Sequence, residues 1–127
     1  MNLTGLNAGL IEAARYAVTV GQAYGLSPEV TSVYRDIREQ QQLRARYENC
    51  LRTYGRVGTE LPAGCRYPAN RPGDSAHNWG LAWDSWVPAA QMPLWVQIRE
   101  ALGWTVPEAD QVHAELPNWR SYVRRAG

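Results

Sequence analysis

The chain has 127 residues, of which 45% are hydrophobic, and its formal net charge at pH 7 is +1. This length suits a single domain spanning residues 1–127 with one hydrophobic core. The nearly neutral charge argues against a nucleic-acid-binding protein, and no apolar run is long enough to predict a membrane span.

Helical spacing of apolar residues predicts a first helix over residues 6–24. The β-branched and aromatic residues at 30–34 then favour a short strand. Asp36 can cap a second helix, over residues 36–53, because Glu39 follows three residues later as in a capping box.

The stretch from Arg56 to Asp74 is rich in glycine and proline, which predicts a loop that could form one wall of a cleft. Cys50 and Cys65 flank part of this loop. A disulfide between them would contribute about 3 kcal/mol in an oxidising compartment. Two free thiols and metal ligation are the alternatives to that disulfide.

The C-terminal half predicts a mixture of strands and helices. Residues 80–87 suit a buried strand, and residues 93–103 suit a helix with proline in its first turn and glycine at its end. Short strands are predicted at 104–106 and 112–116, and a short helix at 118–125. Helices segregated from a small sheet define an α+β fold, and we expect that sheet to be antiparallel.

Both histidines of the chain are near acidic residues. Asp84 follows His77 by seven positions, and His113 lies on a separate predicted strand. Two neutral imidazoles and one carboxylate are a ligand set that catalytic zinc prefers, with the fourth position left for water. Zinc can lower the pKa of that water to about 7. Because neighbouring strands can bring these side chains to one point, we expect one catalytic zinc ion there.

Two carboxylates near His113 are candidates for the general base. Asp110 lies where the chain enters the predicted strand, so it can reach the water on the metal without binding the metal itself. Glu115 shares a strand face with His113 and could hold its imidazole. Glu108, beside Pro107 in an expected turn, is more typical of a solvated carboxylate.

Arg35 and Ser75 are weaker candidates when taken alone. A fixed guanidinium near a metal can bind a substrate carboxylate or stabilise an oxyanion, but most arginines are surface charges. A serine before His77 is most often a loop hydroxyl or a helix cap.

The chain has six tryptophans. We expect most of them in the core, with Trp83 pointing away from Asp84 because alternate strand residues face opposite sides. Trp79 or Trp119 could line a groove for a glycan or a peptide.

Two motifs together resemble a known family. The first is Ser75-x-His77-x-x-Gly80-x-Ala82-x-Asp84, followed by Asp110-x-x-His113. It resembles the signature of the zinc peptidases that include VanY-like D-Ala-D-Ala carboxypeptidases, vancomycin-resistance dipeptidases and phage L-alanyl-D-glutamate endolysins. The group also contains lysostaphin-type enzymes and the hedgehog signalling domain.

The second motif lies upstream, in residues 32–43, and resembles the family's Ser-Gly-Tyr-Arg-Ser-x-x-x-Gln pattern. Val33 stands where the family usually has glycine, and Asp36 stands where serine is common. The resemblance covers most of the chain from Ser32 to Glu115.

The resemblance implies a role for each matching residue. Asp110 would be the catalytic base and then the proton donor. Arg35 would polarise the scissile carbonyl or bind substrate, with Gln40 and Ser75 supporting the substrate. The zinc ligands would be His77, Asp84 and His113.

Asp110 also helps to choose within the family. Carboxypeptidase and dipeptidase members usually carry glutamate at this position, whereas phage L-alanyl-D-glutamate endopeptidases usually carry aspartate. We therefore expect a peptidoglycan endopeptidase that acts as a phage endolysin. The alternatives are a D-Ala-D-Ala carboxypeptidase on the same fold and a non-hydrolytic zinc-containing wall-binding module, although a pure binder needs neither Asp110 nor Arg35.

We expect the protein to be a monomer and its partner to be bacterial peptidoglycan. The N-terminal residues show neither the basic region nor the apolar stretch of a secretory signal peptide. We therefore expect synthesis in the host cytoplasm, with delivery to the wall by a holin or by the virion.

Overall fold

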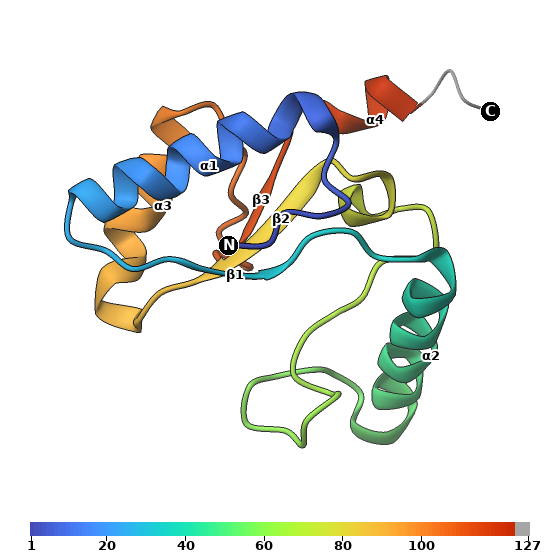
Figure 1. The fold of residues 1–127 in the computed structure, drawn as a ribbon. Coiled ribbons are helices and arrows are strands. Elements are labelled where there is room, and N and C mark those ends of the chain that lie inside the picture. Colours follow the sequence, from blue (N-terminus) through green and yellow to red (C-terminus); the bar gives the residue numbers. More distant parts are fainter. Residues whose placement is uncertain (124–127) are drawn as a thin grey trace.

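The computed structural model describes residues 1–123, in which helices α1 and α3 lie on one side of a three-stranded sheet and α2 extends away from it (Figure 1). The helices are α1 (Ala8–Ala23), α2 (Ile37–Tyr54), α3 (Met92–Ala101) and α4 (Trp119–Val123). The strands are β1 (Glu29–Ser32), β2 (Ala82–Trp86) and β3 (His113–Glu115). Two 3₁₀ turns lie at Ala76–Trp79 and Ala89–Gln91. The predicted α+β class is confirmed.

The sheet is antiparallel, with β2 between β1 and β3. Asp84 of β2 pairs with His113 of β3 on one side and with Ser32 of β1 on the other. Alternation along β2 sends Trp83 into the core, where it is fully buried. Asp84 therefore faces the opposite side of the sheet, as the sequence predicted.

The main core lies where α1 and α3 pack against each other and against Trp83 (Figure 1). Trp83 meets Trp95 and Trp104 edge to face, with ring centroids 6.2 Å and 5.6 Å apart. Gly21 of α1 lets Trp95 approach closely, because a Cβ atom there would lie 2.8 Å from the indole ring. This packing gives β2 a rigid support behind Asp84.

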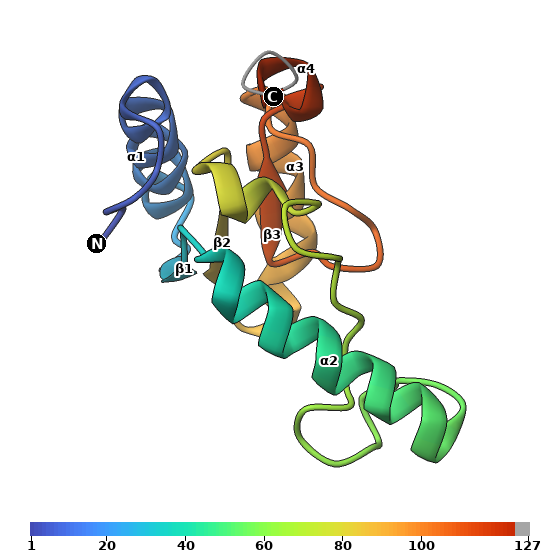
Figure 2. The same ribbon diagram turned by 90° about the vertical axis from the view of Figure 1, so that its right-hand side faces the viewer.

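A second lobe, which we call the disulfide lobe, consists of α2 and residues 55–74. It projects away from the sheet and its helices (Figure 2). A disulfide joins Cys50 of α2 to Cys65, with their Cα atoms 5.5 Å apart. Arg44 also donates a hydrogen bond of 3.0 Å to the carbonyl of Ala69. The sequence left a disulfide, two free thiols and metal ligation as alternatives for these cysteines, and the structure has the disulfide.

Several predicted boundaries differ from the observed ones. The first strand ends at Ser32, two residues earlier than predicted, because the following carbonyl groups bond to the turn at 76–79 instead. The strand predicted at 104–106 is reduced to a single bridge from Thr105 to Glu115. The terminal helix predicted at 118–125 is observed from Trp119 to Val123, and positions 124 and 125 lie outside the described residues.

Within residues 1–123, no helix combines the length and the apolar character needed to cross a bilayer.

Candidate metal centre and active site

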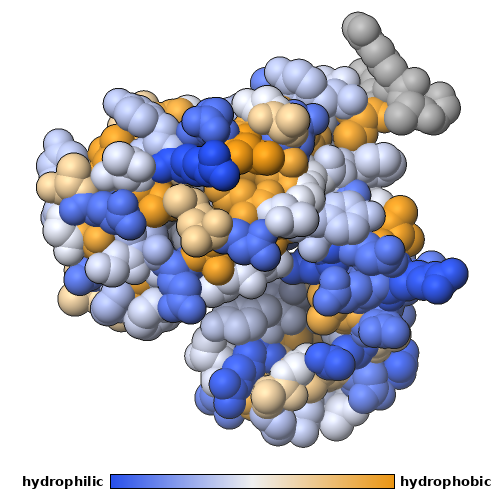
Figure 3. Space-filling view, viewed as in Figure 1, coloured by the Kyte–Doolittle hydropathy of each residue, from blue (hydrophilic) through white to orange (hydrophobic). Residues whose placement is uncertain are grey.

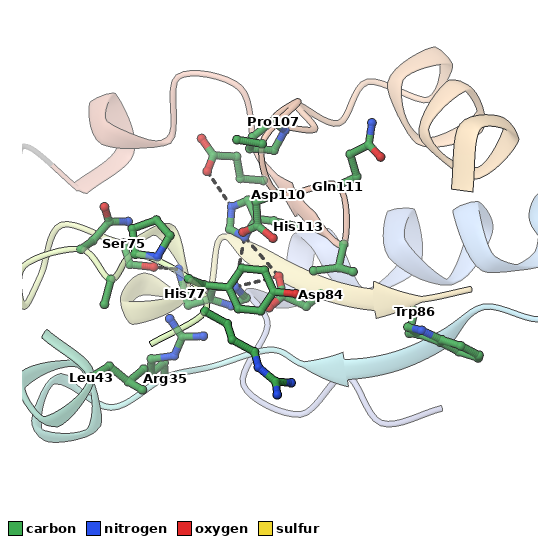
Figure 4. A pocket seen from close by; sticks show the side chains of 18 of the residues that line it. Arg35, Leu43, Ser75, His77, Asp84, Trp86, Pro107, Asp110, Gln111 and His113 are labelled. Carbon is green, nitrogen blue, oxygen red and sulfur yellow. Dashed lines mark hydrogen bonds and ion pairs between the residues drawn. The ribbon is translucent and has the colours of Figure 1, made fainter. Parts of the chain in front are cut away.

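Three ligand atoms converge on the sheet face opposite the core (Figure 4). His77 Nε2 lies 3.0 Å from Asp84 Oδ1, and His113 Nδ1 lies 3.1 Å from each of these atoms. A tetrahedral zinc ion with bonds of about 2.0–2.1 Å separates its ligand atoms by roughly 3.3 Å. Within the described part of the chain, this is the one group of His, Cys, Asp and Glu found with metal-site spacing.

The outer nitrogen of each imidazole has a partner that fixes the ring. His77 Nδ1 is bonded to the carbonyl oxygen of Val33, and His113 Nε2 lies 2.7 Å from Glu115 Oε1. When these outer nitrogens donate, the inner nitrogens carry lone pairs directed at Asp84. Three acceptors facing one another at this distance repel unless a cation lies between them, so the donor set fits zinc.

Without a metal ion, this ligand set would hold a proton. Burial opposes ionisation of Asp84, but its hydrogen-bond contacts with His113 and His77 outweigh burial and hold the pKa of Asp84 below its ordinary value. Burial likewise opposes protonation of His113, yet hydrogen bonds with Asp84 and Glu115 raise its pKa to about 9. A metal ion entering this site must displace that proton.

A capped 3₁₀ turn places His77. The Ser75 hydroxyl accepts a hydrogen bond of 3.3 Å from the backbone N–H of His77. Gly80 ends the turn with a φ of +69°, and a Cβ atom there would lie 2.6 Å from the carbonyl oxygen of Gly5. Ser75 lines the pocket and holds the turn that carries His77, while its predicted support of the substrate stays a prediction.

The same turn joins the two sequence motifs. The backbone N–H of Arg35 donates to the His77 carbonyl at 3.1 Å, and Asn78 Nδ2 donates to the Arg35 carbonyl at 2.8 Å. Together with the bond from His77 to Val33, these contacts fix the Arg35 backbone beside the metal ligands. The buried Asn78 was not singled out from the sequence.

Arg35 and Gln40 act as a pair in the structure. Arg35 lines the pocket, and its Nη1 donates a hydrogen bond of 3.1 Å to Gln40 Oε1. Gln40 is only 1% exposed, and its Nε2 donates to the carbonyl of Asn70 at 2.7 Å. The structure thus places Gln40 behind Arg35, where it orients the guanidinium and holds the loop of residues 55–74 against α2. Its predicted contact with substrate stays a prediction.

Asp110 lies beside the ligand triangle (Figure 4). Consecutive turns place it, since its N–H donates to the Pro107 carbonyl at 3.2 Å and its own carbonyl accepts from His113 N at 3.0 Å. Although the side chain is open to the pocket, desolvation by the pocket walls and the charge of Asp84 raise its pKa. A carboxylate with a raised pKa is suited to accept a proton from water and return it later.

Arg99 is a further residue of the site that the sequence reasoning missed. This arginine of α3 is fully buried, and burial lowers its pKa to about 10, so it stays charged at neutral pH. Its guanidinium donates to the carbonyls of Gln111 and Val112, the residues between Asp110 and His113. The sequence did contain a signal for the burial of Arg99, because it follows Trp95 by four positions and therefore lies on the same face of the helix.

A pocket of about 900 Å³ opens in front of the ligand triangle. In the space-filling view, a hollow separates the main body of the molecule from the disulfide lobe (Figure 3). Trp86 and Tyr67 line this pocket, whereas Trp79 and Trp119 do not. Four of the tryptophans are buried, in keeping with the sequence expectation: Trp83, Trp95, Trp104 and Trp119.

The fold and the site together define the class of zinc peptidases, in which two histidines and an aspartate hold the metal and another carboxylate lies beside it. The model of the VanY family, described as D-alanyl-D-alanine carboxypeptidase, matches residues 4–121. The chain therefore belongs to the VanY family of zinc-dependent peptidoglycan peptidases. No protein of curated function matches the chain by sequence.

Solved structures share this fold at low sequence identity. A mutant of the vancomycin-resistance D,D-pentapeptidase VanY from the VanB-type cassette, in complex with Zn(II), aligns with a TM-score of 0.67 and 16% identity over 94% of this chain and 78% of its own. VanYB in complex with D-alanine-D-alanine aligns with a TM-score of 0.68 and 17% identity over 94% of this chain and 75% of its own. The LD-carboxypeptidase LdcB gives a TM-score of 0.60 and 19% identity over 98% of this chain and 73% of its own.

Proposed function

We propose that this chain is an endopeptidase that hydrolyses the bond between L-alanine and D-glutamate in the peptidoglycan stem peptide. The observation that carries the peptidase activity is the ligand triangle of His77, Asp84 and His113 with Asp110 beside it. The inner atoms of the triangle lie within 3.1 Å of one another, and the outer partners hold both imidazoles in the orientation that zinc needs.

Zinc, when bound, supplies a Lewis acid that polarises the scissile carbonyl and makes water a better nucleophile at neutral pH. Asp110 accepts a proton from the attacking water and later donates it to the leaving amine. Arg35, oriented by Gln40, donates hydrogen bonds to the oxygen on which negative charge develops. Glu115 keeps His113 in one orientation throughout this cycle.

Two features support an internal rather than a terminal cut. Asp110 stands where the phage endopeptidases that the sequence resembles carry aspartate. The pocket in front of the site is lined by both lobes, and a hollow lies between them, as binding of substrate on both sides of a scissile bond would require (Figure 3).

A D-Ala-D-Ala carboxypeptidase is the second candidate. The family model carries that description, and the structure of VanYB holds D-alanine-D-alanine. On this alternative the same zinc, Asp110 and Arg35 would act, and Arg35 would also be available to bind the terminal carboxylate.

Digestion of defined muropeptides, followed by mass spectrometry of the products, tests the proposal. We expect fragments cut between L-alanine and D-glutamate, no products after treatment with a chelator, and recovery on adding zinc. Loss of one terminal D-alanine would contradict the proposed endopeptidase activity and indicate a D-Ala-D-Ala carboxypeptidase. A folded, zinc-loaded protein that cuts no muropeptide would contradict both and favour a wall-binding module.

We also propose that the protein is a phage endolysin, which a holin releases to the cell wall. The resemblance of Asp110-x-x-His113 to phage enzymes supports it. A free endolysin is found in lysates and is missing from purified virions. Recovery of the protein from purified virions would instead indicate a tail-associated enzyme.

A further inference from the structure

The pocket in front of the metal site has acidic residues on one wall and two arginines on the facing wall. The acidic residues that line it are Asp84, Asp110 and Glu115, all of them at the metal site. The disulfide lobe forms the facing wall of the pocket, to which it contributes Arg46 and Arg66. The proposed mechanism uses neither of these arginines.

Arg46 and Arg66 have no acidic partner within residues 1–123, and they line the pocket, whereas the other arginines of the disulfide lobe without such a partner do not: Arg38, Arg52 and Arg71. On α2, Arg44 pairs with Glu48 at 2.9 Å, and in the following loop Arg56 pairs with Glu60. Within residues 1–123, by contrast, no carboxylate lies within 4.0 Å of Arg46 or Arg66. Two cations left unpaired on one wall repel each other and attract an anion entering the pocket.

The local structure holds both arginines on that wall. Arg66 Nε donates a hydrogen bond of 3.0 Å to the carbonyl of Leu61, whereas its two Nη groups have no protein partner in the described chain. Arg46 passes over Gly64, where the backbone has a φ of +95° and a Cβ atom would lie 2.8 Å from Arg46 Cδ. The disulfide between Cys50 and Cys65 fixes this loop to the helix that carries Arg46.

We propose that Arg46 and Arg66 form a second subsite, which binds a free carboxylate of the stem peptide on the leaving-amine side of the scissile bond. This inference rests on the proposed function for the identity of the substrate. Stem peptides carry such a group as the α-carboxylate of γ-linked D-glutamate and, where present, as the side-chain carboxylate of diaminopimelate. Guanidinium groups bind carboxylates through paired, charge-assisted hydrogen bonds. Amidation of the substrate carboxylate removes the charge and half of the acceptors.

Binding measured without turnover tests the subsite separately from catalysis. The protein is zinc-loaded Asp110→Asn, and calorimetry gives its affinity for muropeptides that differ only in amidation of the D-glutamate or of the diaminopimelate carboxylate. We expect about tenfold tighter binding of the form with the recognised carboxylate free. The amidated position that loses this affinity identifies which of the two carboxylates is bound.

Variants at the two arginines then assign the preference. Arg46→Gln and Arg66→Gln, each added to Asp110→Asn, should bring the affinity for the free-carboxylate form close to that for the amidated form, with the latter unchanged. Arg66→Lys should restore part of the preference, because it keeps the charge and loses the paired hydrogen bonds. Arg52→Gln is the matched control, since this exposed arginine of α2 does not line the pocket.

Equal binding of free and amidated muropeptides would overturn the subsite. Loss of affinity for both forms to the same extent in the arginine variants would also overturn it, because it would indicate a structural role. Arginine-dependent preference in a protein that cuts no muropeptide would support the subsite while contradicting the proposed activity. Cleavage by the wild type, with equal binding of free and amidated muropeptides, would support the proposed activity while contradicting the subsite.

Discussion

The two walls of the pocket are built in different ways. On the sheet wall, each ligand imidazole is held by a second contact, and the loop between Asp110 and His113 is held by the buried Arg99. On the facing wall, the exposed Arg46 extends from α2, and the exposed Arg66 extends from a loop that a disulfide and a few hydrogen bonds connect to α2. We infer that the sheet wall carries the chemistry and that the disulfide lobe recognises the substrate. Changes in the two walls should therefore have separable effects.

The largest effect should come from Asp110→Asn on the sheet wall. The amide cannot take a proton from water, so we expect kcat to fall by roughly 10²- to 10⁴-fold while zinc stays bound. Muropeptide turnover and the zinc content of the same sample check this together. Near-normal turnover would transfer the role of base to Glu115.

Glu115→Gln should weaken zinc binding without removing a ligand. The amide holds the His113 ring less firmly, and loss of such an outer partner costs about 10- to 100-fold in metal affinity. Competition with a chromogenic chelator measures this affinity. Glu108→Gln is the matched control, because it lies in the same region and does not contact a ligand. An equal effect of both changes would show that general charge, rather than the contact with His113, is responsible.

Replacing Cys50 and Cys65 by serine should affect the other wall. For a loop of this length, loss of the disulfide lowers the free energy of unfolding by about 3 kcal/mol. Because the sheet wall stays intact, we expect KM for muropeptides to rise several-fold with little change in kcat or zinc affinity. Chemical denaturation and steady-state kinetics measure these quantities. A collapse of kcat with unchanged KM would mean that the lobe shapes the catalytic groups directly.

The smallest effect concerns protons at the metal site. The pKa of His113 is raised to about 9 in the metal-free protein, so at neutral pH zinc must displace a proton. Zinc affinity should therefore rise with pH and level off above pH 9. Calorimetry in buffers of different ionisation enthalpy should find about one proton released near neutral pH. Zinc binding without proton release would contradict the hydrogen bonding assigned to His113.

The sign of the linked stability change follows from the same pKa. Protonated His113 stabilises the metal-free fold fully below its unfolded value near 6.5, and this stabilisation is lost as pH rises through about 9. Thermal unfolding of metal-free protein should therefore shift to lower temperature across that interval, apart from effects of other groups.

The sequence predicted those parts of the molecule that side-chain type and spacing encode. The capped start of α2 is confirmed, since Asp36 accepts a hydrogen bond of 2.7 Å from the N–H of Arg38. The approach of His77, Asp84 and His113 was also predictable, because strand periodicity puts Asp84 and His113 on one face.

The parts that were not predicted depend on contacts between distant segments. The bond from His77 to the Val33 carbonyl uses the backbone, and a backbone acceptor leaves no mark on residue identity. Arg99 is buried because of the loop that folds over it, and a single helix cannot reveal that loop. Likewise, Gln40 fits the family pattern, yet its position behind Arg35 depends on the carbonyl of Asn70, thirty positions away.

X-ray diffraction from crystals of the zinc-loaded protein, recorded on both sides of the zinc absorption edge, tests the central claim most directly. The account predicts one anomalous peak bounded by His77 Nε2, Asp84 Oδ1 and His113 Nδ1. A peak at any other place, or none in a crystal whose protein retains muropeptide cleavage, would contradict it.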